Sequence, residues 1–380
     1  MEYCWDTSMT LIVTLFTEML SAGGVQGASR LVAAVTAKFS SERGMTVRFL
    51  SLNDAQGLHA VRVGTLEFVV SGYARSRAQF IFATMRAARR RPALVIALHP
   101  HLAPIAWAMK AHTRKLRSMV FAHGVEVWQP LGWPRGPALR RANLIVGPST
   151  DTIERLVTTQ SVPADKIRRL AWGLDPDFEA RLAARNSLLR PPGFPQAGQI
   201  ILSVGRWDTS EQYKGADTLI IVLPRIVKAL PDVALVLVGD GDDRPRLEQL
   251  ARDCGVLERT YFLRGLTAEQ LSACYANCDV FALPSRGEGF GFVFLEAMAY
   301  SKPVVGGAHG GIPDIVEDGV TGLLVPHGDT DRVEQALESL LGHADYARQM
   351  GERGKERVLR EFSFERFQSS LEDLLRDVPF

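Results

Sequence analysis

The sequence lacks any apolar run near the length that crosses a bilayer. No segment of the 380-residue chain has about 18 consecutive apolar residues, so we expect no membrane-spanning helix. The short apolar stretch LIVTLF (residues 11–16) has no basic flank before it and is soon followed by Glu18. Such a stretch is a poor match to a signal peptide and is typical of a buried strand. We therefore expect a cytoplasmic protein.

Cysteine is scarce, and its spacing excludes the common cysteine-based sites. The four cysteines are Cys4, Cys254, Cys274 and Cys278, and no two of them form a CxxC pair. Cys274 and Cys278 are four residues apart, which is the spacing of one helix face. We expect free buried thiols in a reducing compartment and no metal site built from them.

Nucleic-acid signatures are also missing, although basic residues are unevenly distributed. The net charge is only +2, but residues 1–180 carry 22 Lys and Arg against 13 Asp and Glu. Basic clusters occur at residues 85–91, 110–117 and 139–141, with no interleaved aromatic residues and no nucleic-acid-binding motif. Either these clusters are solvated helix faces, or the N-terminal half meets an anionic membrane surface or a phosphorylated substrate.

What the sequence does contain is a regular alternation of short apolar runs and helical stretches. Hydrophobic residues make up 46% of the chain, which is enough for a large buried core. The runs are mostly apolar rather than alternating, which indicates parallel strands covered on both faces. They occur at residues 11–16, 47–52, 66–70, 93–98, 118–123 and 144–149, and again at 200–205, 233–240, 260–265, 280–285, 303–307 and 322–326.

This pattern predicts an α/β protein with two doubly wound, Rossmann-like domains and a cleft between them. We place an N-terminal domain at residues 1–178, a linker at 179–199 and a second domain at 200–361. The linker region is rich in proline and glycine. A closing helix lies within 362–380, and we expect its apolar face to contain Phe364, Phe367, Leu371 and Leu374.

The loop GRWDTSEQYKG (residues 205–215) directly follows one of the predicted strands. In open α/β sheets, ligands bind beyond the carboxyl ends of the strands. Arg206 and Lys214 could converge there on one diphosphate, the arginine as a fork and the lysine as a point charge. The alternative is that both side chains are simply solvated.

The stretch LPSRGEGFGFVFLEAMAY (residues 283–300) places two carboxylates around a glycine-rich bend. Gly289 and Gly291 allow close approach of the backbone, and a helix N-terminus near Phe292 is a natural anion site. Glu288 and Glu296 would repel a diphosphate, so they make sense as partners of neutral hydroxyl groups. A nucleotide sugar has a diphosphate flanked by such hydroxyl groups, those of the ribose on one side and those of the hexose on the other. The alternative is that Glu288 begins a turn and Glu296 belongs to a structural network.

Two further motifs allow more than one interpretation. SAGGVQGASR (residues 21–30), with Asp54 after the second strand, is compatible with dinucleotide binding, but it has no GxGxxG. It fits equally well a glycine turn that brings a backbone N–H to a phosphate. DGD (residues 240–242) looks like a metal-binding DxD, but we favour a cap for the following helix. We therefore expect no metal site.

Five strings in order carry a resemblance to a known family. They are GRWDTSEQYKG, LVGDGDDRPRLEQLA, FLRGLTAEQL, LPSRGEGFGFVFLEAMA and GGIPDIVEDGVTGLLVP. The chain resembles the retaining glycosyltransferases of family 4, which have the two-domain GT-B fold, and the match is densest over residues 200–326. One departure is Asp314, where the family often has glutamate.

The resemblance implies that the C-terminal domain binds a nucleotide sugar and the N-terminal domain binds the acceptor. Residues with implied donor-binding roles are Gly24, Arg206, Lys214, Arg264, Leu266, Glu288, Gly289, Phe290, Gly291, Phe292 and Glu296. Arg206 and Lys214 would bind the diphosphate, and Glu296 the ribose. The transferred sugar would contact Glu288 and the backbone of residues 289–292.

The remaining implied roles concern the base, the phosphate and catalysis. Arg264 and Leu266 would frame the base, and Gly24 would approach the phosphate from the N-terminal domain. His123, in AHGVEVW, matches the family's active-site histidine, and it joins Arg206, Lys214 and Glu288 as the expected catalytic set. The closing helix would cross back onto the N-terminal domain.

The resemblance also implies transfer with retention of anomeric configuration, without a cofactor or a bound metal. Since no carboxylate nucleophile is evident, we favour front-face attack, with the diphosphate helping to deprotonate the acceptor. The loop at residues 210–215 and HGVEVW look most like enzymes that build exopolysaccharide on a lipid carrier. GDP-mannose is the favoured donor, followed by UDP-sugars.

The expected acceptor is a glycan or a polyprenyl-diphosphate-linked sugar at the inner face of an anionic membrane, with the protein bound peripherally. Two alternatives remain open. One is a catalytically silent protein that binds sugar nucleotides, because binding and catalysis need the same residues. The other is a dinucleotide-dependent oxidoreductase, which the missing GxGxxG disfavours.

Overall fold

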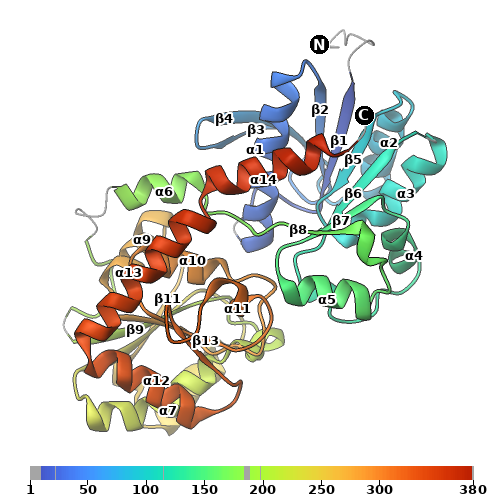
Figure 1. Cartoon of the computed structure of the whole chain (residues 1–380). Helices are drawn as coiled ribbons and strands as arrows, with labels where there is room; N and C mark the ends of the chain where they lie inside the picture. Colours follow the sequence, from blue (N-terminus) through green and yellow to red (C-terminus); the bar gives the residue numbers. More distant parts are fainter. Residues whose placement is uncertain (1–9, 22, 114, 184–188, 197, 379–380) are drawn as a thin grey trace. The chain divides into compact units, whose positions relative to one another are not determined.

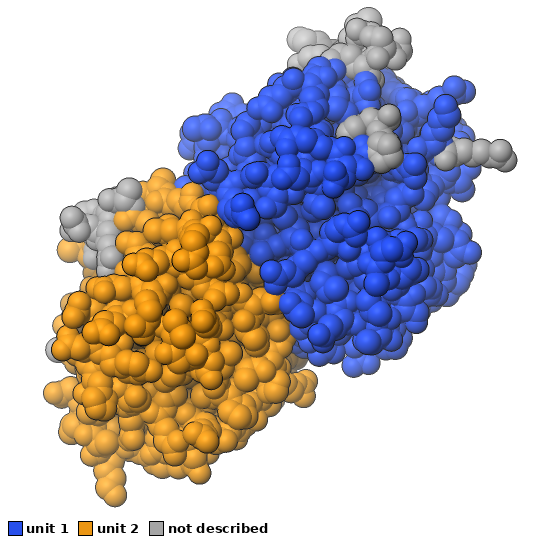
Figure 2. Space-filling view, in the orientation of Figure 1, with its two compact units in different colours: residues 1–177, 364–380 blue, residues 178–363 orange. Residues whose placement is uncertain are grey.

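The structure, a computed structural model, describes residues 10–21, 23–113, 115–183, 189–196 and 198–378. Of the features named above, Cys4, Ala22, Arg114 and parts of the predicted linker (184–188 and 197) lie outside these ranges. The chain forms two compact units (Figure 2). Unit 1 contains residues 1–177 and 364–380, and unit 2 contains residues 178–363.

Unit 1 is built on an eight-stranded sheet (Figure 1) in the order β3-β4-β2-β1-β5-β6-β7-β8. The strands are β1 (Leu11–Phe16), β2 (Thr46–Ser51), β3 (Gly57–Val63), β4 (Leu66–Gly72), β5 (Leu94–Ala97), β6 (Arg117–Phe121), β7 (Leu144–Gly147) and β8 (Ile167–Arg169). All neighbours pair in parallel except β3 and β4. The six strands predicted in this half are confirmed, whereas β3 and β8 were not predicted.

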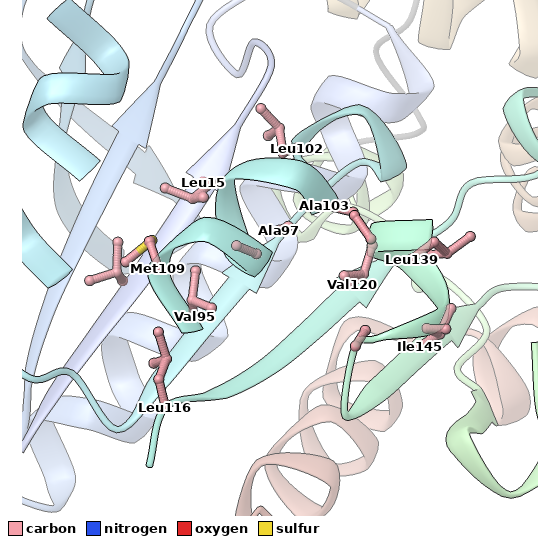
Figure 3. Packing of buried hydrophobic residues seen from close by; sticks show 14 of the residues in the cluster. Leu15, Val95, Ala97, Leu102, Ala103, Met109, Leu116, Val120, Leu139 and Ile145 are labelled. Carbon is pink, nitrogen blue, oxygen red and sulfur yellow. The ribbon is translucent and has the colours of Figure 1, made fainter. Parts of the chain in front are cut away.

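The helices of unit 1 pack on this sheet and close its core. They are α1 (Gly24–Glu42), α2 (Arg77–Ala88), α3 (Ala103–His112), α4 (Arg135–Arg140), α5 (Thr150–Thr158) and α14 (Phe364–Arg376). Side chains from β1, β5, β6 and α3, among them Leu15, Val95, Val120 and Met109, meet in one buried cluster (Figure 3). Burial of this apolar surface is the main force that holds the unit together.

Unit 2 has a six-stranded, wholly parallel sheet in the order β11-β10-β9-β12-β13-β14. The strands are β9 (Gln199–Val204), β10 (Val233–Val238), β11 (Thr260–Leu263), β12 (Val280–Leu283), β13 (Val304–Gly307) and β14 (Leu323–Val325). Each was predicted. The helices are α7 (Ala216–Ala229), α8 (Arg244–Asp253), α9 (Ala268–Asn277), α10 (Phe292–Ala299), α11 (Ile312–Ile315), α12 (Thr330–Gly342) and α13 (Ala344–Glu361).

The closing helix α14 belongs to unit 1, where it lies against α1, and Glu372 comes within 3.9 Å of Lys38. Phe367 and Leu371 of the predicted apolar face are buried, whereas Phe364 and Leu374 are half-buried and Leu375 is buried instead. Phe367, Leu371 and Leu375 are four residues apart and therefore lie on one face of the helix, and that face packs against the core. The predicted linker also contains regular structure, since α6 (Pro176–Ala183) extends into it.

The fold buries two of the cysteines as free thiols. Cys274 and Cys278 are buried and unpaired, and burial raises the pKa of each thiol to about 12. None of the helices in the described ranges is both long and apolar enough to cross a bilayer.

Candidate active site

The sheet of unit 2 reverses its winding between β9 and β12. From β9 the chain continues outward through β10 and β11, whereas β12 starts the opposite half of the sheet. Loops that follow the two strands at such a switch point diverge, and ligands of doubly wound proteins bind there. The loops are also tied together, because the Arg286 N–H donates to the Tyr213 carbonyl at 2.8 Å.

Arg206 and Lys214 lie on the loop after β9, as predicted. The Arg206 side chain is 67% exposed, whereas that of Lys214 is only 13% exposed. Burial lowers the pKa of Lys214, and the nearby charge of Glu288 partly opposes that shift. Gly215 ends the loop at φ 80°, and a Cβ there would come within 2.8 Å of the Pro284 carbonyl. This glycine therefore lets the lysine loop press against the loop after β12.

The segment after β10 fixes the same loop from its other side. A Cβ at Gly241 would lie 2.0 Å from the Trp207 carbonyl. Asp242 accepts hydrogen bonds from the N–H and hydroxyl of Thr209, and Asp243 accepts one from Gln212. The predicted helix-capping role for the DGD motif is wrong, since α8 begins after Asp243 without a side-chain cap. These carboxylates brace the lysine loop instead.

Glu288 lies on the bend after β12, where nearby groups do not fully offset the cost of burying its negative charge. Burial raises its pKa, although Lys214 and Arg206 pull the pKa in the opposite direction. Within the described part of the chain, its buried Oε1 has no hydrogen-bond partner. The bend is held by the glycine pair after β13, because Gly311 N–H donates to the Glu288 carbonyl at 2.7 Å. A buried carboxylate oxygen without a partner is a candidate for ligand binding.

Glu296 lies on α10, which starts after the left-handed Gly291 (φ 110°). Its Oε2 accepts a hydrogen bond of 2.6 Å from the hydroxyl of the fully buried Tyr275 on α9. This partner was not predicted, since no local pattern joins two residues on different helices. Tyr275 fixes the direction of the Glu296 carboxylate.

The other predicted donor residues occupy neighbouring places. Phe290 is buried and Phe292 half-buried, with ring centroids 5.5 Å apart in an edge-on arrangement. Gly289 is buried in the same bend. Arg264, which is exposed, and the half-buried Leu266 follow β11, two strands away from β9. All of them therefore lie at the same carboxyl edge of the sheet.

The sheet of unit 1 also has a switch point, between β1 and β5. The predicted residues Gly24 and His123 lie at the carboxyl edge of this sheet, after β1 and β6 respectively. Gly24 is the first residue of α1 and is exposed. His123 is buried, stacks on Trp172 at a centroid distance of 5.5 Å, and contacts the Leu98 carbonyl at 2.6 Å through Nε2. Because a carbonyl only accepts, Nε2 carries the proton and Nδ1 of a neutral ring is left as an acceptor.

His99 is a residue that the sequence analysis missed. Its ring centroid lies 6.0 Å from that of His123 and 4.4 Å from that of His101. Burial, reinforced by His123, His101 and Arg135, lowers the pKa of His99 to about 3, so the ring is neutral at pH 7. The signal available in the sequence was its position directly after a predicted apolar strand.

The dinucleotide interpretation loses its acidic residue. Both carboxylate oxygens of the buried Asp54 accept backbone hydrogen bonds, from the N–H groups of Met19 and Leu20. Asp54 therefore shapes the turn before α1. No group of three or more His, Cys, Asp or Glu side chains in the described ranges is arranged to hold a metal ion.

Two doubly wound units, one of which has cations and carboxylates at its switch point, are typical of GT-B glycosyltransferases. The sequence profile of glycosyl transferases group 1 matches residues 185–357, and that of glycosyltransferase family 4 matches residues 25–178. The chain therefore belongs to the glycosyltransferases that these two profiles describe, as the resemblance in the sequence indicated.

Relatives of known activity are similar over most of their length. A GDP-mannose-dependent alpha-(1-6)-phosphatidylinositol monomannoside mannosyltransferase of Mycobacterium tuberculosis is 34% identical over 275 residues, covering 68% of this chain and 69% of the relative. The protein of the same name from Mycolicibacterium smegmatis is 33% identical over 289 residues, covering 70% and 72%.

Solved structures confirm the fold. A sucrose-phosphate synthase from Thermosynechococcus elongatus superposes with a TM-score of 0.75 at 21% identity, over 97% of this chain and 99% of its own. The Anabaena protein HepE, solved with UDP and glucose, gives a TM-score of 0.72 at 18% identity over 97% and 99%. The predicted GT-B fold is thereby confirmed.

Proposed function

We propose that this glycosyltransferase moves a mannosyl group from GDP-mannose to a hydroxyl of a lipid-linked acceptor, with retention of configuration and without a bound metal. The relatives named above, which are described as GDP-mannose-dependent, support the choice of donor. UDP-sugars are the next candidates. The acceptor is a polyprenyl-diphosphate-linked glycan or a phosphatidylinositol mannoside, the class named for the relatives.

In this proposal the switch point of unit 2 binds the donor. Arg206 and Lys214 bind the diphosphate and stabilise the charge that develops on it as the glycosidic bond breaks. Glu296, oriented by Tyr275, accepts hydrogen bonds from the ribose. Glu288, whose Oε1 has no partner in the described chain, accepts them from the transferred sugar. That orphaned oxygen beside two cations is the observation that best supports the proposal.

The chemistry follows a front-face path. The acceptor hydroxyl attacks the anomeric carbon on the side from which the diphosphate departs, and the departing diphosphate oxygen takes the hydroxyl proton. Bond cleavage and bond formation on one face retain the configuration. His123, whose Nε2 contacts the Leu98 carbonyl at 2.6 Å, is the histidine that this proposal assigns to the active site.

A nucleotide panel tests the donor assignment. We expect GDP to raise the melting temperature of the wild type more than UDP or ADP does, because a ligand that binds only the native state stabilises it by mass action. Glu296→Ala should reduce the GDP shift, and the exposed-site variant Lys228→Ala should not. A larger melting-temperature shift with UDP than with GDP would identify uracil as the base of the donor. No shift with any nucleotide would contradict the proposal.

We also propose that helix α2 brings the protein to the membrane. Ile81 and Phe82 are neighbours on this helix and are 47% and 68% exposed. Exposed arginines accompany them at Arg77 and Arg86. An apolar patch beside arginines matches the interface of an anionic bilayer.

Vesicle sedimentation tests this surface. We expect wild-type protein to bind vesicles that contain phosphatidylglycerol at low salt and to dissociate at raised salt. The double variant Ile81→Ser, Phe82→Ser should bind at least about tenfold more weakly, because two apolar side chains no longer enter the bilayer. Val157→Ser, which changes an exposed apolar residue on α5, is the matched control. Equal binding of both variants would contradict the assignment.

A further inference from the structure

A carboxylate of the same loop lies between the two cations assigned to the donor diphosphate. Glu211 pairs through Oε1 with Nη2 of Arg206, and its Oε2 lies 2.7 Å from Nζ of Lys214. Only 11% of the Glu211 side chain and 13% of the Lys214 side chain are exposed. The two carboxylate oxygens thus bridge the arginine and the lysine, as two oxygens of a diphosphate would.

The neighbouring residues keep Glu211 in this place. It lies in the irregular 3-10 helix η5 (Thr209–Lys214), where its own φ and ψ (−118°, 22°) depart from helical values. Thr209 is bound to Asp242 on one side, and Gln212 is bound to Asp243 on the other. Glu211 is therefore held between two anchored positions.

The charges favour exchange of one anion for another. A carboxylate brings one negative charge to the pair of cations, whereas a diphosphate brings more charge and more acceptor oxygens. A diphosphate can therefore displace Glu211, but only by breaking the two ion pairs with Arg206 and Lys214. The free energy of binding is reduced by that loss.

We propose that Glu211 is an internal competitor for the diphosphate site, which it occupies in the ligand-free protein and leaves when the donor binds. This rests on the proposed function in assigning Arg206 and Lys214 to the diphosphate. Glu211 weakens the binding of both the donor and the nucleoside diphosphate product, and so it speeds product release. It is an affinity-determining residue rather than a catalytic one.

The sign of the effect separates this role from a structural one. If Glu211 competes with the ligand, Glu211→Gln binds diphosphates more tightly, because a neutral amide holds the two cations less strongly. If Glu211 orients Arg206 and Lys214 for the ligand, the same substitution weakens binding. The isosteric glutamine keeps the size of the side chain in either case.

Isothermal titration with inorganic pyrophosphate and with GDP measures this sign. We expect Glu211→Gln to lower Kd for both by about tenfold, which corresponds to about 1.4 kcal/mol. Glu334→Gln, which removes a half-buried carboxylate paired with Arg225, should leave both values unchanged. The added substitution Lys214→Ala should abolish the gain, since the competition takes place at that cation.

Each outcome decides the matter. An unchanged or higher Kd of Glu211→Gln for pyrophosphate overturns the proposal, and so does a failure of pyrophosphate to bind either protein. Tighter pyrophosphate binding without GDP binding supports the role of Glu211 and contradicts GDP-mannose as the donor. Urea unfolding of each variant verifies that the native fold is retained.

Discussion

Lys214→Ala is expected to lower kcat by about 10²- to 10³-fold, the loss typical of removing one preorganised group that stabilises developing charge. The lysine is only 13% exposed and its pKa is lowered by burial, so its charge acts in a partly desolvated place. Charge on the diphosphate grows as the glycosidic bond breaks, so the lysine is worth more in the transition state than in the substrate complex. Initial rates with GDP-mannose over a range of concentrations would separate kcat from KM.

Lys228→Ala is the matched control, because Lys228 is an exposed lysine of α7 in the same unit. It should leave kcat and KM unchanged. A rise in KM with normal kcat in Lys214→Ala would mean that the lysine binds substrate and transition state equally. Near-normal values of both would contradict its place at the diphosphate.

Most of the sheets could be predicted because buried parallel strands have a direct signature. Strand β10 is apolar at every position, β1 is apolar except at Thr14, and both strands are buried at every position. Strand β3 escaped prediction because it is an edge strand with alternating exposure, and β8 because it has only three residues. The position of Leu375 on α14 depended on the turn of a helix against its neighbours, which residue spacing alone does not fix.

The candidate site divides in the same way. Arg206, Lys214 and Glu288 could be found because each follows a strand closely, and strand ends are where ligands of doubly wound sheets bind. Glu211, Tyr275 and the role of the aspartates after β10 could not. Their partners are set by which strands are neighbours and how loops pack, as when Asp242 reaches Thr209 from 33 positions away.

Glu288→Gln is expected to make the protein more stable at pH 7 while lowering kcat by about 10²-fold. Burial raises the pKa of Glu288, so the ionised carboxylate is less favourable in the folded than in the unfolded protein. Glutamine keeps the shape without the charge. The loss of turnover follows from the proposed contact with the transferred sugar. Thermal unfolding across pH and initial rates would measure the two effects.

The pH dependence gives the sign. The stability that a raised carboxyl pKa provides is complete below the unfolded-state value of about 4.3 and is lost as pH rises through the folded value. The gain in melting temperature of Glu288→Gln over the wild type should therefore be near zero at the acidic end and grow toward neutral pH.

Glu317→Gln is the control for a carboxylate of the same unit, because Glu317 is 56% exposed and pairs with Arg357 at 3.1 Å. Because the Glu317 carboxylate is itself largely exposed, its ion pair contributes little, and the melting temperature of Glu317→Gln should follow the wild type at every pH. A Glu288→Gln protein that is less stable at pH 7 would mean that Lys214 and Arg206 stabilise the carboxylate by more than its burial costs. In that case the two cations already compensate the Glu288 charge before any sugar binds, and the pKa of Glu288 is not raised in the folded protein.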